Sequence, residues 1–208
     1  MTAAGRGHTC VRPAVRAGAT REDTAMSDAV PSGYPDLGPQ PVPDVRVFTV
    51  PAVPTAVVRA KGMPMATIDG LFDAVFGSAL PEAFHRGVVP VGPALALYTS
   101  IGDGPEGVAD VEIGFPVARA LEQPIVADEL TVEPSELPAG RVAVVSHLGA
   151  YDQLGGAWGS FLGAIDEKGD TPGVPFWEAY VTEPTPDMDP ATLRTDLYCL
   201  LGGTDDAA

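Results

Sequence analysis

The sequence has few of the residues from which disulfides, metal sites and nucleophilic active sites are usually built. Its 208 residues include no asparagine, two cysteines (Cys10 and Cys199) and three histidines. The cysteines lie far apart in the sequence, so no disulfide framework is suggested, and a reducing compartment fits. No histidine stands at metal-ligand spacing from a cysteine or from another histidine. We therefore predict no metal site and no cofactor.

Positive charge is also scarce. Lysine and arginine together number 12, against 28 aspartates and glutamates, which gives a formal net charge of -16. Such a chain would repel nucleic acid phosphates and anionic membrane surfaces, whereas it would attract a cationic ligand. We expect neither nucleic acid nor a membrane among its partners.

The first 44 residues lack the pattern of a folded element. Residues 1–25 hold four arginines but no apolar run long enough for a secretory signal peptide, and Met26 resembles a natural start. Residues 29–43 contain five prolines, which predict an extended, unpaired lead-in. We expect residues 1–44 to be a disordered or extended arm without a site, residues 202–208 to be a loose tail, and the protein to be cytoplasmic.

Hydrophobic periodicity predicts strands and two helices between residues 45 and 201. A helix of about three turns should begin at Met65, with Asp69 and Asp73 on the side opposite its apolar stripe. A second helix should run from Tyr151 to a stop at Gly169. Residues 81–93 are expected to form a loop, and residues 123–140 a partly extended crossover. Strands are predicted at residues 45–50, 55–60, 94–100, 108–117, 141–147, 176–182 and 193–201, the first two joined by a tight connection.

The predicted elements repeat. Residues 45–117 and 141–201 both follow the order strand, glycine-containing turn, helix, loop, strand, loop, strand, and residues 95–98 occupy the place of residues 177–180. Each half alone is a thin sheet with one helix that could not bury both faces. We therefore predict an α+β fold of duplicated strand-helix-strand-strand halves related by a pseudo-twofold axis, with a ligand groove between them.

Several common catalytic motifs are absent from the sequence, and one nucleotide-binding motif that is present lacks the structural context it needs. Residues 102–107 match the glycine spacing of a dinucleotide-binding fingerprint, but a strand follows them rather than a helix, and Asp103 and Glu106 would repel phosphates. There is no G-x-S-x-G elbow, no Walker loop and no evident Cys-His pairing. The remaining reactive groups are a carboxylate and phenols in the predicted groove.

That carboxylate belongs to Glu178. In the strand predicted at residues 176–182, alternation places Phe176, Glu178 and Tyr180 on one face and Trp177 on the other. A glutamate between two aromatic rings either pairs with a neighbouring arginine as a structural residue or faces a ligand, because burying an unpaired carboxylate is costly. The small Ala96 occupies the equivalent position in the first half and would leave room for a guest.

Two further residues have a structural and a functional interpretation. Trp158 lies on the apolar stripe of the second helix, where aromatic residues usually pack in a core. His147 could orient a ligand, although a histidine that closes a strand more often hydrogen-bonds to backbone.

Three stretches of the second half carry a family resemblance: VSHLGAYDQL with Ala157 and Trp158 (145–154 and 157–158), WEAYVTEP (177–184) and RTDLY (194–198). The sequence from about residue 45 to residue 201 resembles the bacterial GyrI-like small-molecule-binding family, which includes gyrase-inhibitor-like proteins and the effector-binding domains of multidrug-sensing regulators. The resemblance implies a groove with a glutamate, here Glu178, and aromatic walls from Tyr98, Tyr151, Trp177 and Tyr180. No helix-turn-helix segment precedes residue 45, so direct transcriptional control is not expected.

Two function classes follow from this resemblance. In the first, the groove binds a cationic or aromatic ligand and Glu178 neutralises its charge. In the second, the chain resembles hydrolases that open the cyclopropane ring of DNA-alkylating natural products. Glu178 would then direct a water onto the ring, and Tyr180 would hydrogen-bond the developing phenolate. The sequence does not decide between them, because both use the same groove.

Overall fold

The computed structural model describes residues 37–102, 107–185 and 187–202. Most of the predicted arm, the predicted tail and the centre of the glycine-rich loop therefore lie outside the described residues.

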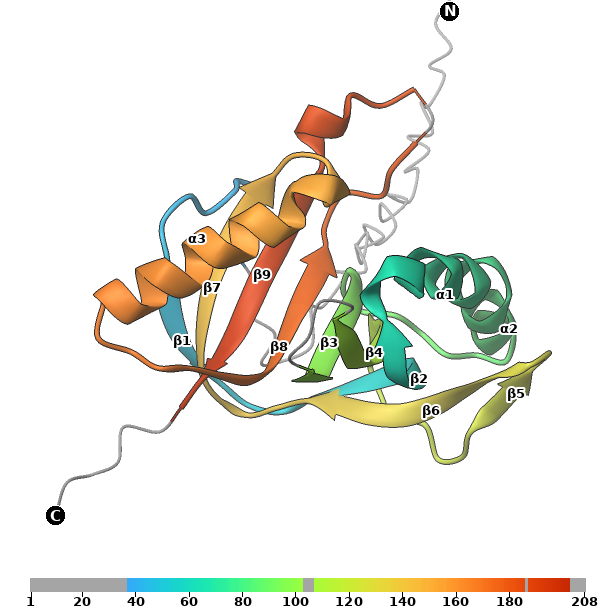
Figure 1. The fold of residues 1–208 in the computed structure, drawn as a ribbon. Coiled ribbons are helices and arrows are strands. Elements are labelled where there is room, and N and C mark those ends of the chain that lie inside the picture. The colour runs from blue at the N-terminus through green and yellow to red at the C-terminus, as the bar shows by residue number, and fades with distance from the viewer. Residues whose placement is uncertain (1–36, 103–106, 186, 203–208) are drawn as a thin grey trace, which may run out of the picture.

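The core of the structure is one nine-stranded sheet in which every neighbouring pair is antiparallel (Figure 1). The strand order is β1-β7-β9-β8-β3-β4-β2-β6-β5. This mixture of helices with an antiparallel sheet confirms the predicted α+β class. The strands are β1 (Arg46–Val50), β2 (Val53–Pro64), β3 (Ala94–Ile101), β4 (Val108–Pro116), β5 (Ile125–Ala127), β6 (Leu130–Leu137), β7 (Gly140–Leu148), β8 (Pro172–Tyr180) and β9 (Arg194–Leu201).

Helices cover one face of this sheet in two separate groups (Figure 1). In the first half, β2 is followed by a helical run of four segments: η1 (Met65–Thr67), α1 (Ile68–Ala74), the π-helical turn η2 (Val75–Ala79) and α2 (Leu80–His85). In the second half, η3 (Tyr151–Gln153) and α3 (Leu154–Glu167) follow β7. A short turn, η4 (Pro190–Thr192), precedes β9. The strand order β7-β9-β8 of one half is mirrored by β3-β4-β2 of the other, and the central β3–β8 pair joins them.

Apolar side chains fill both faces of the sheet. The helix-covered face carries one cluster under α1 and α2, which includes Val75 and Ile113, and another under α3, which includes Phe161 and Leu197. The opposite face carries a third cluster, which includes Leu95, Trp177 and Tyr198. Burial of the first two clusters, worth roughly 1.5–3 kcal/mol for each large side chain, attaches each helix group to the sheet.

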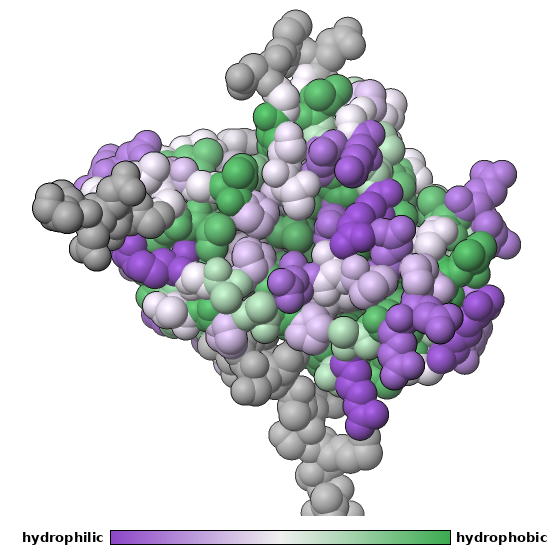
Figure 2. All heavy atoms as spheres, turned by 90° about the horizontal axis from the view of Figure 1, so that it is seen from below, coloured by the Kyte–Doolittle hydropathy of each residue, from purple (hydrophilic) through white to green (hydrophobic). Residues whose placement is uncertain are grey.

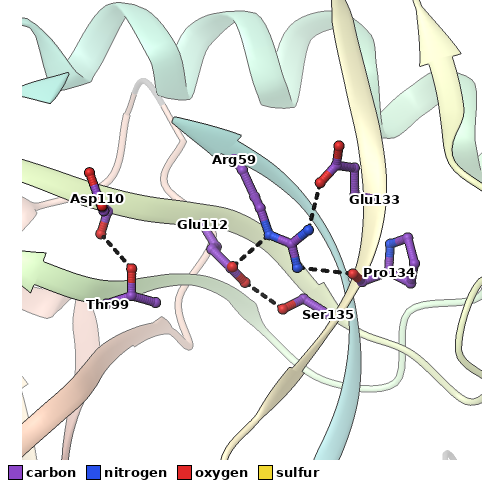
Figure 3. A network of polar contacts seen from close by, with 7 residues as sticks. All are labelled: Arg59, Thr99, Asp110, Glu112, Glu133, Pro134 and Ser135. Carbon is purple, nitrogen blue, oxygen red and sulfur yellow. Dashed lines mark hydrogen bonds and ion pairs between the residues drawn. The ribbon is translucent and has the colours of Figure 1, made fainter. Parts of the chain in front are cut away.

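Strands β2, β4 and β6 are joined by an arginine-centred network (Figure 3). The guanidinium of Arg59 donates to Glu112 Oε1 at 2.7 Å, to Glu133 Oε2 at 2.6 Å and to the carbonyl of Pro134 at 3.0 Å. The hydroxyl of Ser135 donates to the other oxygen of Glu112 at 2.6 Å. Glu112 is thus an example of a carboxylate with a structural role in this sheet, because an arginine neutralises it. The surroundings of Glu178 are compared with this example below.

The molecule seen from below shows how hydrophilic and hydrophobic residues are distributed on the face away from the helices (Figure 2). Hydrophilic residues gather toward the end where β5 and β6 lie, and apolar residues are interspersed among them. None of the described helices is long and apolar enough to span a membrane.

The structure corrects the predicted helix and loops of the first half. The helical run does not end after about three turns but continues from Met65 through η2 and α2 to His85, so the first five residues of the loop predicted at residues 81–93 are helical. Pro81 lies at the start of α2, directly after the π-helical turn η2. Residues 123–140, predicted as a partly extended crossover, contain the paired strands β5 and β6.

One prediction about the start of the fold is confirmed and one is wrong. Strands β1 and β2 are joined by a tight connection, as predicted, and each pairs elsewhere: β1 with β7, and β2 with β4 and β6. The predicted unpaired lead-in is wrong, because Val42 is buried, its N–H donates to Ser146 Oγ at 2.8 Å, and its carbonyl accepts from the Ser146 N–H at 2.8 Å.

Candidate functional site

A large pocket opens on the helix-covered side of the sheet, between the two helix groups. Its volume is about 1600 Å³, and its walls come from α1, η2, α3, β3 and β8, with contributions from the segment after β8. Aromatic side chains dominate the walls: Phe72, Phe76, Phe84, Tyr98, Phe115, Tyr151, Trp158, Phe176 and Tyr180. Four carboxylates also line it (Asp69, Asp73, Glu178 and Glu183), whereas its described lining contains no lysine, arginine or histidine.

Glu178 lies on β8, in the middle of the sheet. The predicted alternation is observed, because Phe176, Glu178 and Tyr180 line the pocket while Trp177 and Ala179 pack in the cluster on the opposite face. Ala96 lies directly opposite Glu178 on β3. A small neighbour at this cross-strand position leaves space above the sheet where a larger side chain would fill the pocket floor.

Both oxygens of the Glu178 carboxylate are held by neutral donors. The indole N–H of Trp158 on α3 donates to Oε1 at 2.7 Å, and the hydroxyl of Tyr180 donates to Oε2 at 2.6 Å. Glu178 is only 5% exposed, and no ion pair to it is found in the described part of the chain. The structure therefore does not support the structural alternative, in which an arginine neutralises this glutamate.

Burial dominates the electrostatics of the site. Desolvation raises the pKa of Glu178, and the hydrogen bonds from Tyr180 and Trp158, together with the charge of His147, oppose that rise. The pKa values of Tyr180, Tyr98 and Tyr151 are also raised, first by burial and then by the negative charge of Glu178. All three phenols are therefore neutral at physiological pH and act as hydrogen-bond donors or as ring surfaces.

The aromatic rings around Glu178 support one another. Tyr98 on β3 stacks on Phe176 of β8, with centroids 5.2 Å apart and planes 17° apart, and Trp158 meets the same Phe176 edge-on at 4.8 Å. Tyr151, 40% exposed at the start of η3, contacts the ring of Tyr180 edge-on at 5.6 Å. Of the predicted wall residues, the structure brings Tyr98, Tyr151 and Tyr180 together around Glu178.

Trp177 does not lie in the pocket, which corrects its assignment as a wall residue. Its side chain is 1% exposed on the opposite face of β8, stacked on Tyr198 with centroids 5.1 Å apart and planes 4° apart. The strand period itself explains this, since neighbours of Glu178 in the sequence must point away from it.

Trp158 takes the role that Trp177 was expected to have. It was interpreted mainly as a core residue, yet its ring lines the pocket and its N–H holds Glu178. The signal was present in the spacing, because Tyr151, Leu154, Trp158 and Leu162 recur at three and four residues and all line the pocket. Aromatic residues at helical spacing could not be assigned to core or pocket without knowing what faces the helix.

Asp69 and Asp73 are exposed, as predicted for the side of the first helix opposite its apolar stripe. What the sequence did not predict is that both also line the pocket, next to Phe72 and Phe76. The pocket lies beside that helix, so a side chain can be solvent-exposed and still face the cavity.

His147 is the last residue but one of β7 and lies on the same face of the sheet as Glu178, since it pairs with Thr195 of β9, which in turn pairs with Tyr180 of β8. Its Nε2 is buried without a hydrogen-bond partner among the described residues, so the backbone bond expected of a strand-closing histidine is not found at that atom. It does not line the pocket. In the part of the chain that the structure describes, no three acidic, cysteine or histidine side chains are arranged to hold a metal ion.

Comparison with solved structures identifies the same architecture elsewhere. The C-terminal domain of EcmrR is 16% identical with a TM-score of 0.62, and the match covers 76% of this chain and 97% of that domain. A longer EcmrR chain, in complex with DNA, is 17% identical with a TM-score of 0.61, and this chain spans 57% of its length. SAV2435 bound to tetraphenylphosphonium is 10% identical with a TM-score of 0.55, and the match covers 77% of this chain and 94% of SAV2435.

At these identities the solved structures establish the fold alone. The family is established separately, because the model of the GyrI-like small molecule binding domain matches residues 43–201, most of the chain. The chain belongs to the GyrI-like small-molecule-binding domain family.

Proposed function

We propose that residues 45–201 form one domain that captures cationic, aromatic small molecules, with the carboxylate of Glu178 as the counter-charge. The observation that supports this most strongly is a carboxylate buried in an aromatic pocket, held by the neutral donors of Trp158 and Tyr180 and without an ion pair in the described part of the chain. Such a charge is costly to bury without a positive partner. A ligand cation would supply that partner.

The walls suit the same class of ligand. Flat or multi-ring cations gain from contact with ring faces, at roughly 1–2 kcal/mol for each desolvated cation–ring contact. The structurally similar SAV2435 is bound to tetraphenylphosphonium, a cation surrounded by aromatic rings. The mirrored strand order of the halves supports a duplication whose junction is the pocket.

The test is a Glu178→Gln variant titrated with two probes, tetraphenylphosphonium and the neutral triphenylphosphine oxide. The amide keeps the shape, can accept from Trp158 and can donate to the Tyr180 oxygen, so the fold should be preserved. Loss of the charge should weaken phosphonium binding by roughly 1.5–3 kcal/mol and leave the neutral probe almost unchanged. Glu167→Gln, an exposed change on α3 outside the pocket, controls for net charge. Equal affinity of both Glu178 forms for the phosphonium would overturn the proposal.

A second function uses the same residues. In a hydrolase that opens cyclopropane rings, Glu178 would accept a proton from water as the water oxygen bonds to the ring carbon. The breaking carbon–carbon bond would leave its electrons on a phenolate stabilised by Tyr180. The raised pKa of Glu178 favours this role, because it makes the carboxylate a better base. Mass analysis of a cyclopropanoid electrophile incubated with the protein would detect a hydrated product. Glu178→Gln should lower its rate of formation about a hundredfold or more.

A further inference from the structure

We propose that this pocket prefers elongated ligands with two cationic centres, one at Glu178 and the other at Asp69 and Asp73 on α1. The inference rests on the proposed function, because it assumes that Glu178 meets the first positive charge. It goes further in naming the class of ligand and a second group of specificity-determining residues.

The two aspartates form a pair on one wall. They lie one helical turn apart, both are exposed, both line the pocket, and neither takes part in an ion pair within the described residues. Asp69 is in the first turn of α1, where an acid stabilises a helix by complementing its dipole. Asp73 gains nothing from that effect, since the helical run continues past it to His85. The helix dipole therefore explains an acid at position 69 but not at position 73.

A continuous aromatic wall joins this pair to Glu178. Phe72 lies between the two aspartates in the sequence, and its ring meets the ring of Tyr180 edge-on with centroids 5.7 Å apart. The Tyr180 hydroxyl donates to Glu178 Oε2. An apolar or aromatic linker lying along Phe72 and Tyr180 would have one end at the buried carboxylate and the other at the aspartates.

Size and charge give independent support. A volume of about 1600 Å³ is larger than the range of roughly 300–1000 Å³ typical of pockets for drug-sized ligands. Glu178 is more than nine-tenths buried, faces this pocket and has no cationic partner in its described lining. A compact monocation would neutralise Glu178 and leave both aspartates uncompensated at the other wall, whereas a long dication would neutralise both ends.

The test uses a series of α,ω-bis(phenyldimethylammonio)alkanes of increasing spacer length, each with a monocationic counterpart in which a neutral tert-butylphenyl group replaces one end. Affinities are measured by calorimetry for the wild type, for Asp69→Asn/Asp73→Asn and for Asp166→Asn/Glu167→Asn. The last variant removes two exposed charges from α3 outside the pocket, as a matched control. Because the aspartates are exposed, we expect the pocket variant to weaken dication binding about fivefold, and monocation binding less than twofold.

The outcomes separate this inference from the proposed function. The wild type should bind at least one dication more tightly than its monocationic counterpart, with an optimum spacer length, and that preference should disappear only in the Asp69/Asp73 variant. If dication and monocation affinities fall equally, or fall as much in the α3 control, the second site is overturned. Glu178→Gln titrated with the monocations then shows whether the proposed function survives. Loss of monocation binding in that variant supports it, and unchanged binding rejects it as well.

Discussion

Glu178 differs from the buried Asp196 and the partly buried Glu112 in the groups that hold its carboxylate. Asp196 accepts two hydrogen bonds of 2.9 Å from Arg194, and Glu112 is paired with Arg59, whereas Glu178 accepts from the neutral donors Trp158 and Tyr180 and has no ion pair among the described residues. Its raised pKa has a consequence for stability. The contribution of Glu178 is most favourable below its unfolded pKa and is lost as the pH rises through its folded value. Ionised Glu178 thus lowers the stability of the fold at neutral pH. Such a loss is expected of a residue that is kept for binding.

At the scale of this residue, replacing Trp158 by phenylalanine should change the charge state of Glu178. The ring contact with Phe176 is largely kept, but the N–H that stabilises the carboxylate is lost, so the pKa of Glu178 should rise further. A smaller fraction of Glu178 is then ionised at any given pH. We expect the midpoint of the pH dependence of cation affinity to move upward, and the affinity at the wild-type midpoint to fall.

Calorimetric titration with tetraphenylphosphonium across a pH series measures both effects. Tyr180→Phe, which removes the other donor, should move the midpoint in the same direction. A Trp158→Phe variant that loses affinity equally for triphenylphosphine oxide, with an unmoved midpoint, would show that Trp158 only shapes the wall.

At the scale of elements, local patterns predicted the strands better than their partners. The runs that became β3, β4, β7 and β9 are rich in β-branched and apolar residues and lie within a residue or two of the predicted bounds. The pairing of β1 with β7, whose partner residues lie 90 (Val50 with Gly140) to 98 (Arg46 with Val144) positions apart in the sequence, could not be predicted, because a strand's own residues do not specify a distant partner. Residues 123–140 were missed as strands because their prolines and acids resemble a loop. Pro134 is accommodated in β6 opposite Ala56.

The residues of the site were also predictable where local periodicity decides their position, and not where long-range packing does. Alternation alone places Glu178 and Tyr180 on one face, and the structure agrees. The sequence did not assign three other residues to the pocket: Trp158, Asp69 and Asp73. That assignment depends on where the two helix groups lie relative to the sheet, which is decided by long-range packing. Sequence periodicity identifies the packed side of a helix but does not distinguish a core from the wall of a cavity.

The helix α3 has four glycines among its 14 residues, so replacing one of them is expected to change the stability of the protein. Nothing lies within 4 Å of a side-chain atom added at Gly159. Glycine inside a helix costs about 0.5–1 kcal/mol relative to alanine, so Gly159→Ala should stabilise the protein by that amount and raise Tm by about 1–4 °C.

Gly149→Ala provides the opposite control. Its backbone φ is +152°, and an added Cβ would lie 2.5 Å from Gln153 Oε1 and 2.9 Å from His147 Nε2, so this change should lower Tm. Thermal unfolding of both variants measures the difference. A lowered Tm for Gly159→Ala would mean that this face of α3 contacts another surface.

At the scale of the whole molecule, the pocket and the overall charge act in the same direction. The net charge of -16 attracts cations over long distances, an effect that weakens with ionic strength, whereas the buried Glu178 acts at contact and is screened much less. Salt should therefore reduce the rate of cation capture more than the part of the affinity that depends on Glu178.

The pH dependence of cation affinity tests the central claim most directly. Because burial raises the pKa of Glu178, its carboxylate becomes neutral at a higher pH than the ordinary value of 4.5. Tetraphenylphosphonium is titrated at constant ionic strength from about pH 4 to pH 8, upward from the ordinary pKa of a glutamate. Wild-type affinity should rise with pH through a midpoint above 4.5, and Glu178→Gln should show no such rise. The same rise in both proteins, or a wild-type affinity that does not change across this range, would contradict the account.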